Sequence, residues 1–491
     1  MERSQAMRLT ALSAMVVLCA AALAVPAGSP SPAAANRRAP VPTDASDLAA
    51  ILSPPAGGPV GDGPVGLQAT VSDYNEALVT EARWPVLSPD GKARGKQRWR
   101  IVTGTGNCCE NYLGSTPRGR LFDFGGDYIF YTDDEGLSWK RVESADRIPD
   151  FGEGAIAVAP GGDIVGVAWN PYYGDRVEPF KYEAEEETWY YTHTKLHQPF
   201  FDRQSLGVVP GPFTFAGTEY PYLVLLKGGW PAKDPWFVSF DGLNYFVPSG
   251  KFADQIASEP KTGWLDYKPT PAHDWMQPHF QTRLAALDGG RAVSATSTYV
   301  NDELSADLAL FDGNEVKWRA FELGRGTLPR GGNLLTDSKG RLHYVHSGKK
   351  GIGYLMSADG GRSWVKEMVP WPAGARGGGP DDPADEPSEV PTPELDFRAS
   401  GELGITAIAA HISNRETGVS QDYVYRFSTT GNRIELTDIY LVGAGDLVTG
   451  NGVSSTDPRF DFATIALLPD GRVALSFMDT MHTTPAIAIQ Q

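Results

Sequence analysis

One pattern recurs along the chain: an apolar stretch, a turn rich in Pro, Gly and Asp, and a second apolar stretch. Each copy predicts a hairpin, because short apolar runs separated by turn residues are typical of paired strands. A second pattern follows nearly every copy and consists of two more short runs, the last carrying Trp or another aromatic residue. The chain is therefore expected to fold as a series of four-stranded antiparallel sheets. Seven copies of the first pattern lie at 111–124, 155–169, 205–226, 283–296, 333–345, 396–410 and 463–477.

Sheets repeated in this way favour a β-propeller, in which each sheet is one blade of a ring. We predict an all-β fold, a seven-bladed β-propeller of four-stranded antiparallel blades, with a six-bladed propeller as the alternative. The copy at 463–477 is followed by only a short tail, so the outer strands of its blade are expected from the N-terminal side, at 78–102. Such pairing of the chain ends would remove exposed sheet edges. In the copy at 205–226 we expect the turn at Gly211.

The N-terminal part of the chain predicts export rather than folded structure. Residues 1–35 predict a signal peptide, because a short basic region precedes an apolar run and small residues at 33–35 form a cleavage site. Residues 36–66 predict a disordered tether rich in Pro, Ala and Gly. The propeller would occupy 67–491, with an exposed acidic insertion at 373–394. We expect a secreted protein, extracellular or associated with the cell envelope, without a membrane span.

The net charge of the chain limits the kinds of macromolecule that it can bind. The chain has 43 Lys and Arg against 60 Asp and Glu, which gives a formal net charge of −17. We therefore expect no nucleic-acid partner, since binding to nucleic acid depends on neutralising phosphates with cations.

After loss of the signal peptide the adjacent Cys108 and Cys109 remain. Two buried thiols and a strained vicinal disulfide are both open for this pair.

Two of the second hairpins share a finer signature. The turns at 132–139 (TDDEGLSW) and 357–364 (SADGGRSW) both fit S/T-x-D-x-G-x-S/T-W. The Asp carboxylate can accept hydrogen bonds from turn amides, and Gly tolerates a positive φ. The signature resembles the Asp box of the sialidase (neuraminidase) superfamily, whose propellers carry bacterial neuraminidase (BNR) repeats. The residues that carry the resemblance are Asp134, Gly136, Trp139, Asp359, Gly361 and Trp364.

The resemblance implies a glycosidase fold whose Asp boxes lie on the face remote from the active site. It also implies an Arg cluster that binds a carboxylate, a Tyr nucleophile paired with an acidic residue, and an Asp acid/base. This chain lacks the F/Y-R-I-P motif of active sialidases. Its nearest string, D-R-I-P at 146–149, follows the first Asp-box hairpin instead of preceding it and lacks the aromatic residue.

If the hairpin turns share one rim, the starts of first strands and the ends of second strands share the opposite rim. Carboxylates, arginines and aromatic residues gather at these positions, which suits a carbohydrate or glycoconjugate: Arg grips carboxylates bidentately, and polar groups that converge in one concavity bind ligands. Acid/base, nucleophilic or stacking roles are expected for Glu110, Asp202, Tyr173 and His279, and substrate binding for Arg203, Arg330, Trp169 and Asn170.

Histidines supply a rival hypothesis. His346, His411 and His482 recur at the end of the second strand of three successive units, and converging imidazoles could bind a divalent metal. That site would serve a metal-dependent polysaccharide lyase; otherwise no cofactor is expected. The favoured function is a monomeric, sialidase-like glycoside hydrolase. The further alternative is a non-catalytic propeller of the cell envelope that binds a glycan or a protein.

Overall fold

A computed structural model describes separate ranges of the chain between Leu67 and Gln491. The chain divides into two units, Met1–Val41 and Pro42–Gln491, and every described residue belongs to the second. The described residues are 67–105, 112–125, 128–143, 154–170, 176–192, 196–197, 205–215, 218–227, 236–244, 284–287, 291–297, 304–312, 315–322, 333–348, 351–361, 363–371, 395–414, 419–443, 464–479 and 484–491.

Nearly all regular structure in these residues is β-strand. One short 3-10 turn, η1 (Pro160–Gly162), is the only helical element in the described ranges. Within the same ranges, no helix is long and apolar enough to cross a lipid bilayer. The prediction of an all-β fold is confirmed.

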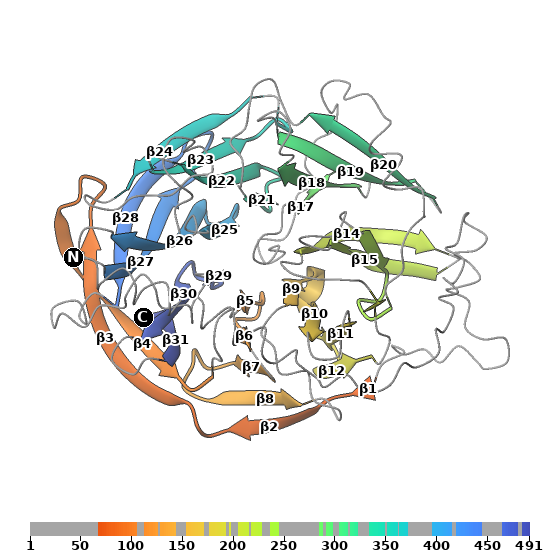
Figure 1. Cartoon of the computed structure of the whole chain (residues 1–491), viewed down its shortest axis with the longest axis horizontal. Helices are drawn as coiled ribbons and strands as arrows, with labels where there is room; N and C mark the ends of the chain where they lie inside the picture. Colours follow the sequence, from red (N-terminus) through yellow and green to blue (C-terminus); the bar gives the residue numbers. More distant parts are fainter. Residues whose placement is uncertain are drawn as a thin grey trace, which may run out of the picture. The chain divides into compact units, whose positions relative to one another are not determined.

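Consecutive strands pair antiparallel in successive groups (Figure 1). The first group holds β5 (Tyr112–Ser115), β6 (Leu121–Gly125), β7 (Tyr128–Thr132) and β8 (Trp139–Glu143). The second holds β9 (Gly154–Val158), β10 (Ile164–Asn170), β11 (Arg176–Glu183) and β12 (Thr188–Tyr191), with β13 (Leu196–His197) paired to β11. The third holds β14 (Ser205–Phe215), β15 (Thr218–Lys227) and β16 (Trp236–Ser239).

The later groups repeat this order. They comprise β17 (Leu284–Leu287), β18 (Arg291–Ser297), β19 (Leu304–Asp312) and β20 (Glu315–Glu322); β21 (Asn333–Thr336), β22 (Leu342–Gly348), β23 (Gly351–Ser357) and β24 (Val365–Pro370); β25 (Leu395–Ser400), β26 (Ile405–Asn414), β27 (Val419–Ser428) and β28 (Glu435–Val442); and β29 (Thr464–Leu467), β30 (Val473–Asp479) and β31 (Thr484–Gln490). Each hairpin predicted from the first pattern is an antiparallel pair of these strands.

The first strands of neighbouring groups contact one another in a closed cycle. The contacts run from β5 to β9, β14, β17, β21, β25 and β29, and from β29 back to β5 (Figure 1). This is the order expected when sheets are arranged as blades around an axis.

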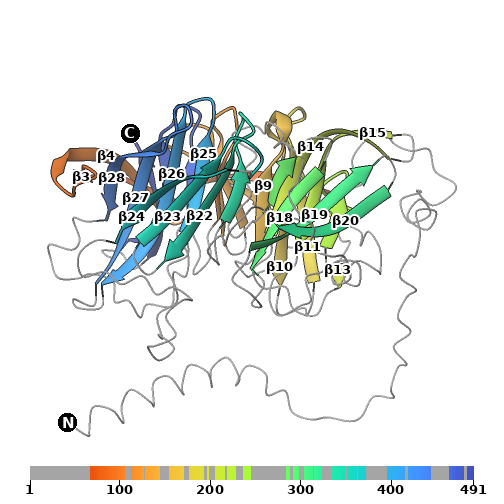
Figure 2. The ribbon, with the colours of Figure 1, turned by 90° about the horizontal axis from the view of Figure 1, so that it is seen from above.

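The N-terminal strands add to the outer edges of sheets formed later in the chain. β1 (Leu67–Gln68) pairs with β12, and β2 (Thr70–Tyr74) pairs with β8. β4 (Ala93–Thr103) pairs with β31, which confirms that the N-terminal side completes the last sheet. The expectation that both outer strands come from this side is wrong, because the tail itself forms β31. β3 (Leu78–Leu87) instead pairs with β28, so one nine-stranded sheet joins two groups (Figure 2).

The third predicted hairpin differs from its expected form. Gly211 does not form the turn but lies inside β14, which pairs with β15 as far as Phe215 opposite Thr218. The register shifts between Pro210 and Phe213. Proline has no N–H to donate to the ladder, so a Pro-Gly-Pro string can mark an irregular strand as well as a turn.

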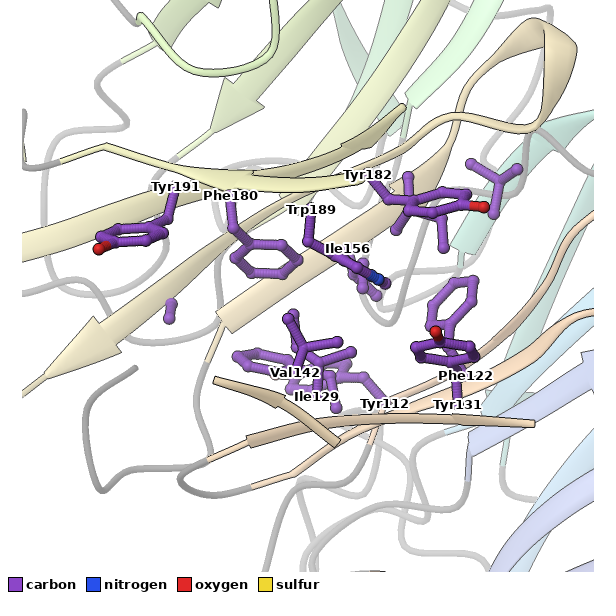
Figure 3. Packing of buried hydrophobic residues seen from close by; sticks show 14 of the residues in the cluster. Tyr112, Phe122, Ile129, Tyr131, Val142, Ile156, Phe180, Tyr182, Trp189 and Tyr191 are labelled. Atoms are coloured by element: carbon purple, nitrogen blue, oxygen red, sulfur yellow. The ribbon is translucent and has the colours of Figure 1, made fainter. Parts of the chain in front are cut away.

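Aromatic side chains pack between neighbouring sheets. Phe180, Tyr182 and Trp189 of the β9–β12 sheet face Tyr131 and its neighbours in the β5–β8 sheet (Figure 3). The Tyr182 and Trp189 ring centroids are 5.0 Å apart. Gly166 lies opposite Phe180 in register, and a Cβ there would come within 2.1 Å of the Phe180 ring. Each such buried ring stabilises the fold by roughly 1.5–3 kcal/mol.

Candidate functional site

The hairpin turns of different sheets lie together on one side. Arg118 Nη1, in the β5–β6 turn, donates to the carbonyl of Ala184 in the β11–β12 turn at 3.3 Å. Arg341 Nη1, in the β21–β22 turn, donates to the carbonyl of Gly431 in the β27–β28 turn at 3.2 Å. We call this side the turn rim. The opposite rim is where the first strands begin and the second strands end.

Two turns on the turn rim share one hydrogen-bond pattern. Asp134 accepts from the backbone N–H and the hydroxyl of Ser138, at 2.9 and 2.6 Å, and from the hydroxyl of Thr132 at 2.8 Å. The turn at 357–364 repeats the three bonds around Asp359, at 2.9, 2.7 and 2.8 Å. In both turns, the carboxylate holds the turn closed with bonds to its own chain.

Charge and packing also hold the turn at 132–139 in place. Burial raises the pKa of Asp134, but its hydrogen bonds outweigh burial and hold the pKa below the usual range. Gly136 has a φ of 86°, and a Cβ there would lie 2.7 Å from Cδ1 of Ile489, so only Gly fits. Trp139 is buried between sheets, whereas Trp364 is half-buried. These groups serve the fold.

A buried polar network also occupies the turn rim. Asp337, wholly buried, accepts from Arg341 Nε at 2.7 Å and lies 2.9 Å from His343 Nε2. His343 Nδ1 lies 2.7 Å from the Tyr354 hydroxyl, which lies 2.7 Å from the Thr406 hydroxyl in the next group. Burial alone would raise the pKa of Asp337, but His343 and Arg341 hold it well below its usual range. The network therefore joins two sheets through an ionised carboxylate.

The structure places few of the predicted site residues. Trp169 and Asn170 are the last two residues of β10, at the opposite rim. His411 lies in β26, opposite Asp422 of β27 in register. The remaining predicted residues lie outside the described ranges: Glu110, Asp202, Tyr173, His279, Arg203, Arg330 and His482.

His346 is the one histidine of the metal hypothesis whose side chain is described. It is buried in β22 opposite Gly353 of β23, and a Cβ on Gly353 would come within 2.0 Å of His346 Nε2. The ring also lies 6.0 Å from that of Tyr344, centroid to centroid. Within the described part of the chain, no group of three or more His, Cys, Asp or Glu is placed to hold a metal ion.

A buried carboxyl that sequence reasoning missed lies in β6. Asp123 is wholly buried, and neither of its oxygens makes a hydrogen bond of normal geometry in the structure that is described. Burial raises its pKa well above the usual range, and the nearby Thr105 hydroxyl offsets this only in part. Burial at this position therefore favours the neutral, protonated form of the Asp123 carboxyl.

Strand alternation puts more polar groups on the same interface. Leu121 packs in the cluster between the β5–β8 sheet and the β29–β31 strands, and Asp123 lies two residues further on the same face of β6. Thr464 and Ser476 share their faces with Ala466 and Ala474 of that cluster and oppose each other in register. Their hydroxyls, too, lack a bond of normal geometry among the described residues. We call Asp123, Thr105, Thr464 and Ser476 the inner polar cluster.

A buried ion pair adjoins the inner polar cluster. Arg398 donates to Asp396 within β25, and both side chains are nearly fully buried. Asp396 Oδ2 also accepts from the backbone N–H of Ile465 in β29 at 2.9 Å. Arg398 Nη2 reaches the carbonyl of Leu113 in β5 at 3.5 Å, and Leu113 is the register partner of Asp123. The pair thus links three neighbouring first strands.

The sequence holds one signal for this region. An acidic residue stands inside the otherwise apolar strand LFDFG at 121–125, where alternation alone would place a hydrophobic side chain. Burial raises the pKa of Asp396 as well, although Arg398 opposes the shift. The carboxyls of Asp123 and Asp396 thus both have raised pKa values, and groups with strongly shifted pKa values are enriched where proteins act on ligands.

Comparisons with known proteins give likenesses of low similarity. No family model and no curated protein matches the chain. Among solved structures, a fucose-specific lectin from Aleuria aurantia is 11% identical at a TM-score of 0.32 and covers 76% of this chain and 97% of its own. An alpha-L-arabinofuranosidase from Fusarium graminearum is 11% identical at a TM-score of 0.36 (68% and 92% covered). An intramolecular trans-sialidase from Ruminococcus gnavus is 12% identical at 0.30 (86% and 94%). Nothing about activity follows from these values.

Proposed function

We propose that this protein is a secreted, seven-bladed β-propeller that binds a glycan at the rim opposite the turns and hydrolyses it. On this proposal the turns at 132–139 and 357–364 are Asp boxes, and the fold is sialidase-like. Glu110 and Asp202 supply the acid and the base, and Arg203 and Arg330 hold an anionic group of the substrate. One carboxyl protonates the leaving oxygen as the glycosidic C–O bond breaks. The other removes a proton from a water molecule, whose oxygen forms the new bond to the anomeric carbon.

The observation that carries the proposal is the buried carboxyl of Asp123, which makes no hydrogen bond of normal geometry among the described residues. Buried polar groups are normally hydrogen-bonded, and exceptions concentrate at functional sites. Asp123 stands at the centre of β6, on the face that packs against the β29–β31 strands. The polar groups of the turn rim, such as Asp134 and Asp337, are by contrast satisfied by their own chain.

A hydrolysis screen tests the proposal. The purified protein is incubated with 4-methylumbelliferyl glycosides, including that of sialic acid, and with anionic polysaccharides, in the presence and absence of EDTA. We expect release that survives EDTA. Glu110→Gln and Asp202→Asn should each lower the rate by at least roughly 100-fold, the scale of lost acid/base catalysis.

Glu185→Gln is the matched control, because Glu185 is exposed in the β11–β12 turn and loses the same charge. It should leave the rate unchanged. Release abolished by EDTA would favour the histidine–metal hypothesis instead. Binding of a glycan without release of any product would overturn the proposal of hydrolysis and show that the protein only binds glycans.

A further inference from the structure

The β3–β4 hairpin presents basic side chains on one face and tryptophans on the other. Residues paired in register share a face, so Arg83 lies beside Arg98, and Lys96 and Arg100 continue the row. Glu81 is the one carboxylate of this face. We call Arg83, Lys96, Arg98 and Arg100 the basic face.

The opposite face fastens the hairpin to the molecule. Trp84 and Trp99 are buried, with ring centroids 5.8 Å apart. Trp84 meets the edge of Phe477 at 5.4 Å, and Trp99 meets Tyr440 at 5.9 Å. Because these rings fix both strands, the basic face is held on a rigid support.

Three of the four cations lack a carboxylate partner within the described part of the chain. Arg83, Lys96 and Arg98 are exposed and form no ion pair with any residue that the structure describes. Arg100 differs, since it donates to the carbonyl of Glu135 in the β7–β8 turn. Like charges directly opposite each other on a sheet are destabilising, so the Arg83–Arg98 pair works against folding in a chain whose net charge is −17.

From this arrangement we propose that the basic face binds an acidic polysaccharide. Alternate side chains on a strand repeat every ~6.7 Å, so the cations form a straight row that suits an extended polymer. Arg guanidinium binds carboxylate and sulfate groups bidentately. Trp99 pairs with Gln490 at the end of β31, which Arg472 of the β29–β30 turn contacts, and Arg100 contacts the β7–β8 turn, so this surface belongs to the turn rim. It is therefore separate from the glycan site proposed on the opposite rim and does not depend on it.

The test measures binding of the full protein to polygalacturonate, with neutral dextran as the uncharged polymer. We expect affinity for polygalacturonate that falls steeply with NaCl, as cation-mediated binding to a polyanion does. The triple variant Arg83→Gln/Lys96→Gln/Arg98→Gln should bind at least roughly tenfold more weakly at low salt. Its thermal unfolding should match or exceed that of the parent, because the variant removes a repulsive pair.

A second triple variant, Lys339→Gln/Lys366→Gln/Arg433→Gln, removes three exposed cations elsewhere and is the matched control. It should retain the parent affinity. Equal losses in the two triple variants would mean a general charge effect and overturn the proposal. So would equal binding to dextran, absence of binding at low salt, or tighter binding to anionic lipid vesicles or to duplex DNA than to polygalacturonate.

Discussion

Asp337 and Asp123 are both wholly buried, yet their surroundings shift their pKa values in opposite directions. Asp337, on the turn rim, meets Arg341 and His343, and its pKa lies well below the usual range. Asp123, in the inner polar cluster, has no bond of normal geometry among the described residues, and its pKa lies well above that range. Both side chains are shielded from solvent, so their hydrogen-bond and charge partners decide the direction of the pKa shift. The polar groups of the turn rim therefore stabilise the fold, whereas those of the inner polar cluster destabilise it.

The largest effect is expected from breaking the turn-rim network. Asp337→Asn leaves the Arg341 guanidinium buried without its carboxylate, which should lower the free energy of unfolding by about 3–5 kcal/mol. Urea denaturation at pH 7 measures the loss. Asp470→Asn, which removes a half-exposed partner of Arg472, should cost less than about 1 kcal/mol. Equal costs for the two variants would contradict a structural role for the network.

Opposite pH dependences should sharpen the comparison. The pKa of Asp123 is higher in the folded protein than in the unfolded chain, where it is about 3.9. As pH rises above that value, the unfolded chain loses its proton first, and the folded protein becomes less stable. Asp123→Asn stays neutral, and its stability relative to the parent should therefore increase by at least about 1 kcal/mol between pH 4 and pH 7. The deficit of Asp337→Asn should shrink instead as pH falls below about 4.

Both pH profiles come from urea midpoints converted to free energies across the pH range. A parent and an Asp123→Asn protein whose stabilities stay parallel with pH would show that this carboxyl is not held protonated. The comparison between the two aspartates would then fail.

The two repeated turns should respond alike. Asp134→Ala and Asp359→Ala each remove three hydrogen bonds from the turn, and each should cost about 1–2 kcal/mol. Matched urea midpoints check the values. A cost for one turn and none for the other would contradict a shared structural role.

The smallest effect is expected at the exposed ion pair of Glu135 with Arg472, which joins two turns at 2.6 Å. Glu135→Gln should cost only about 0.2–1 kcal/mol. The difference should disappear in ~1 M NaCl, where screening is strong. A cost that persists at high salt would mean that this pair acts like the buried Asp337 network.

Local sequence patterns predicted the strands, but they could not predict every pairing between strands far apart in the sequence. The strands of the seven first hairpins follow from neighbouring residues. The pairing of 78–102 with the last repeat was predicted from the short tail after that repeat and from the need to close sheet edges. The extra pairing of β3 with β28 depends on residues more than 300 positions apart, which no local pattern encodes. Gly211 was misplaced because proline and glycine mark strand irregularities as well as turns.

The residue types alone also could not show that Asp337 has bonding partners and that Asp123 differs from it. Asp337 follows a strand in the turn DSKGR, which suggests only a turn, and its bonds to Arg341 and His343 become visible when β21 and β22 are paired. Asp123 stands out in an apolar strand, but its lack of a bonding partner is a property of the assembled interface. The predicted residues at the opposite rim remain predictions for experiment.

Hydrogen exchange with and without a bound glycan tests the division between the two rims most directly. The ligand is the polymer or oligosaccharide that scores highest in the hydrolysis screen, offered to an Asp202→Asn protein so that it is not consumed. We predict slower exchange in peptides that span the ends of β6, β10 and β30, and no change in the turns at 116–120 and 337–341. Protection confined to those turns would contradict the placement of the glycan site.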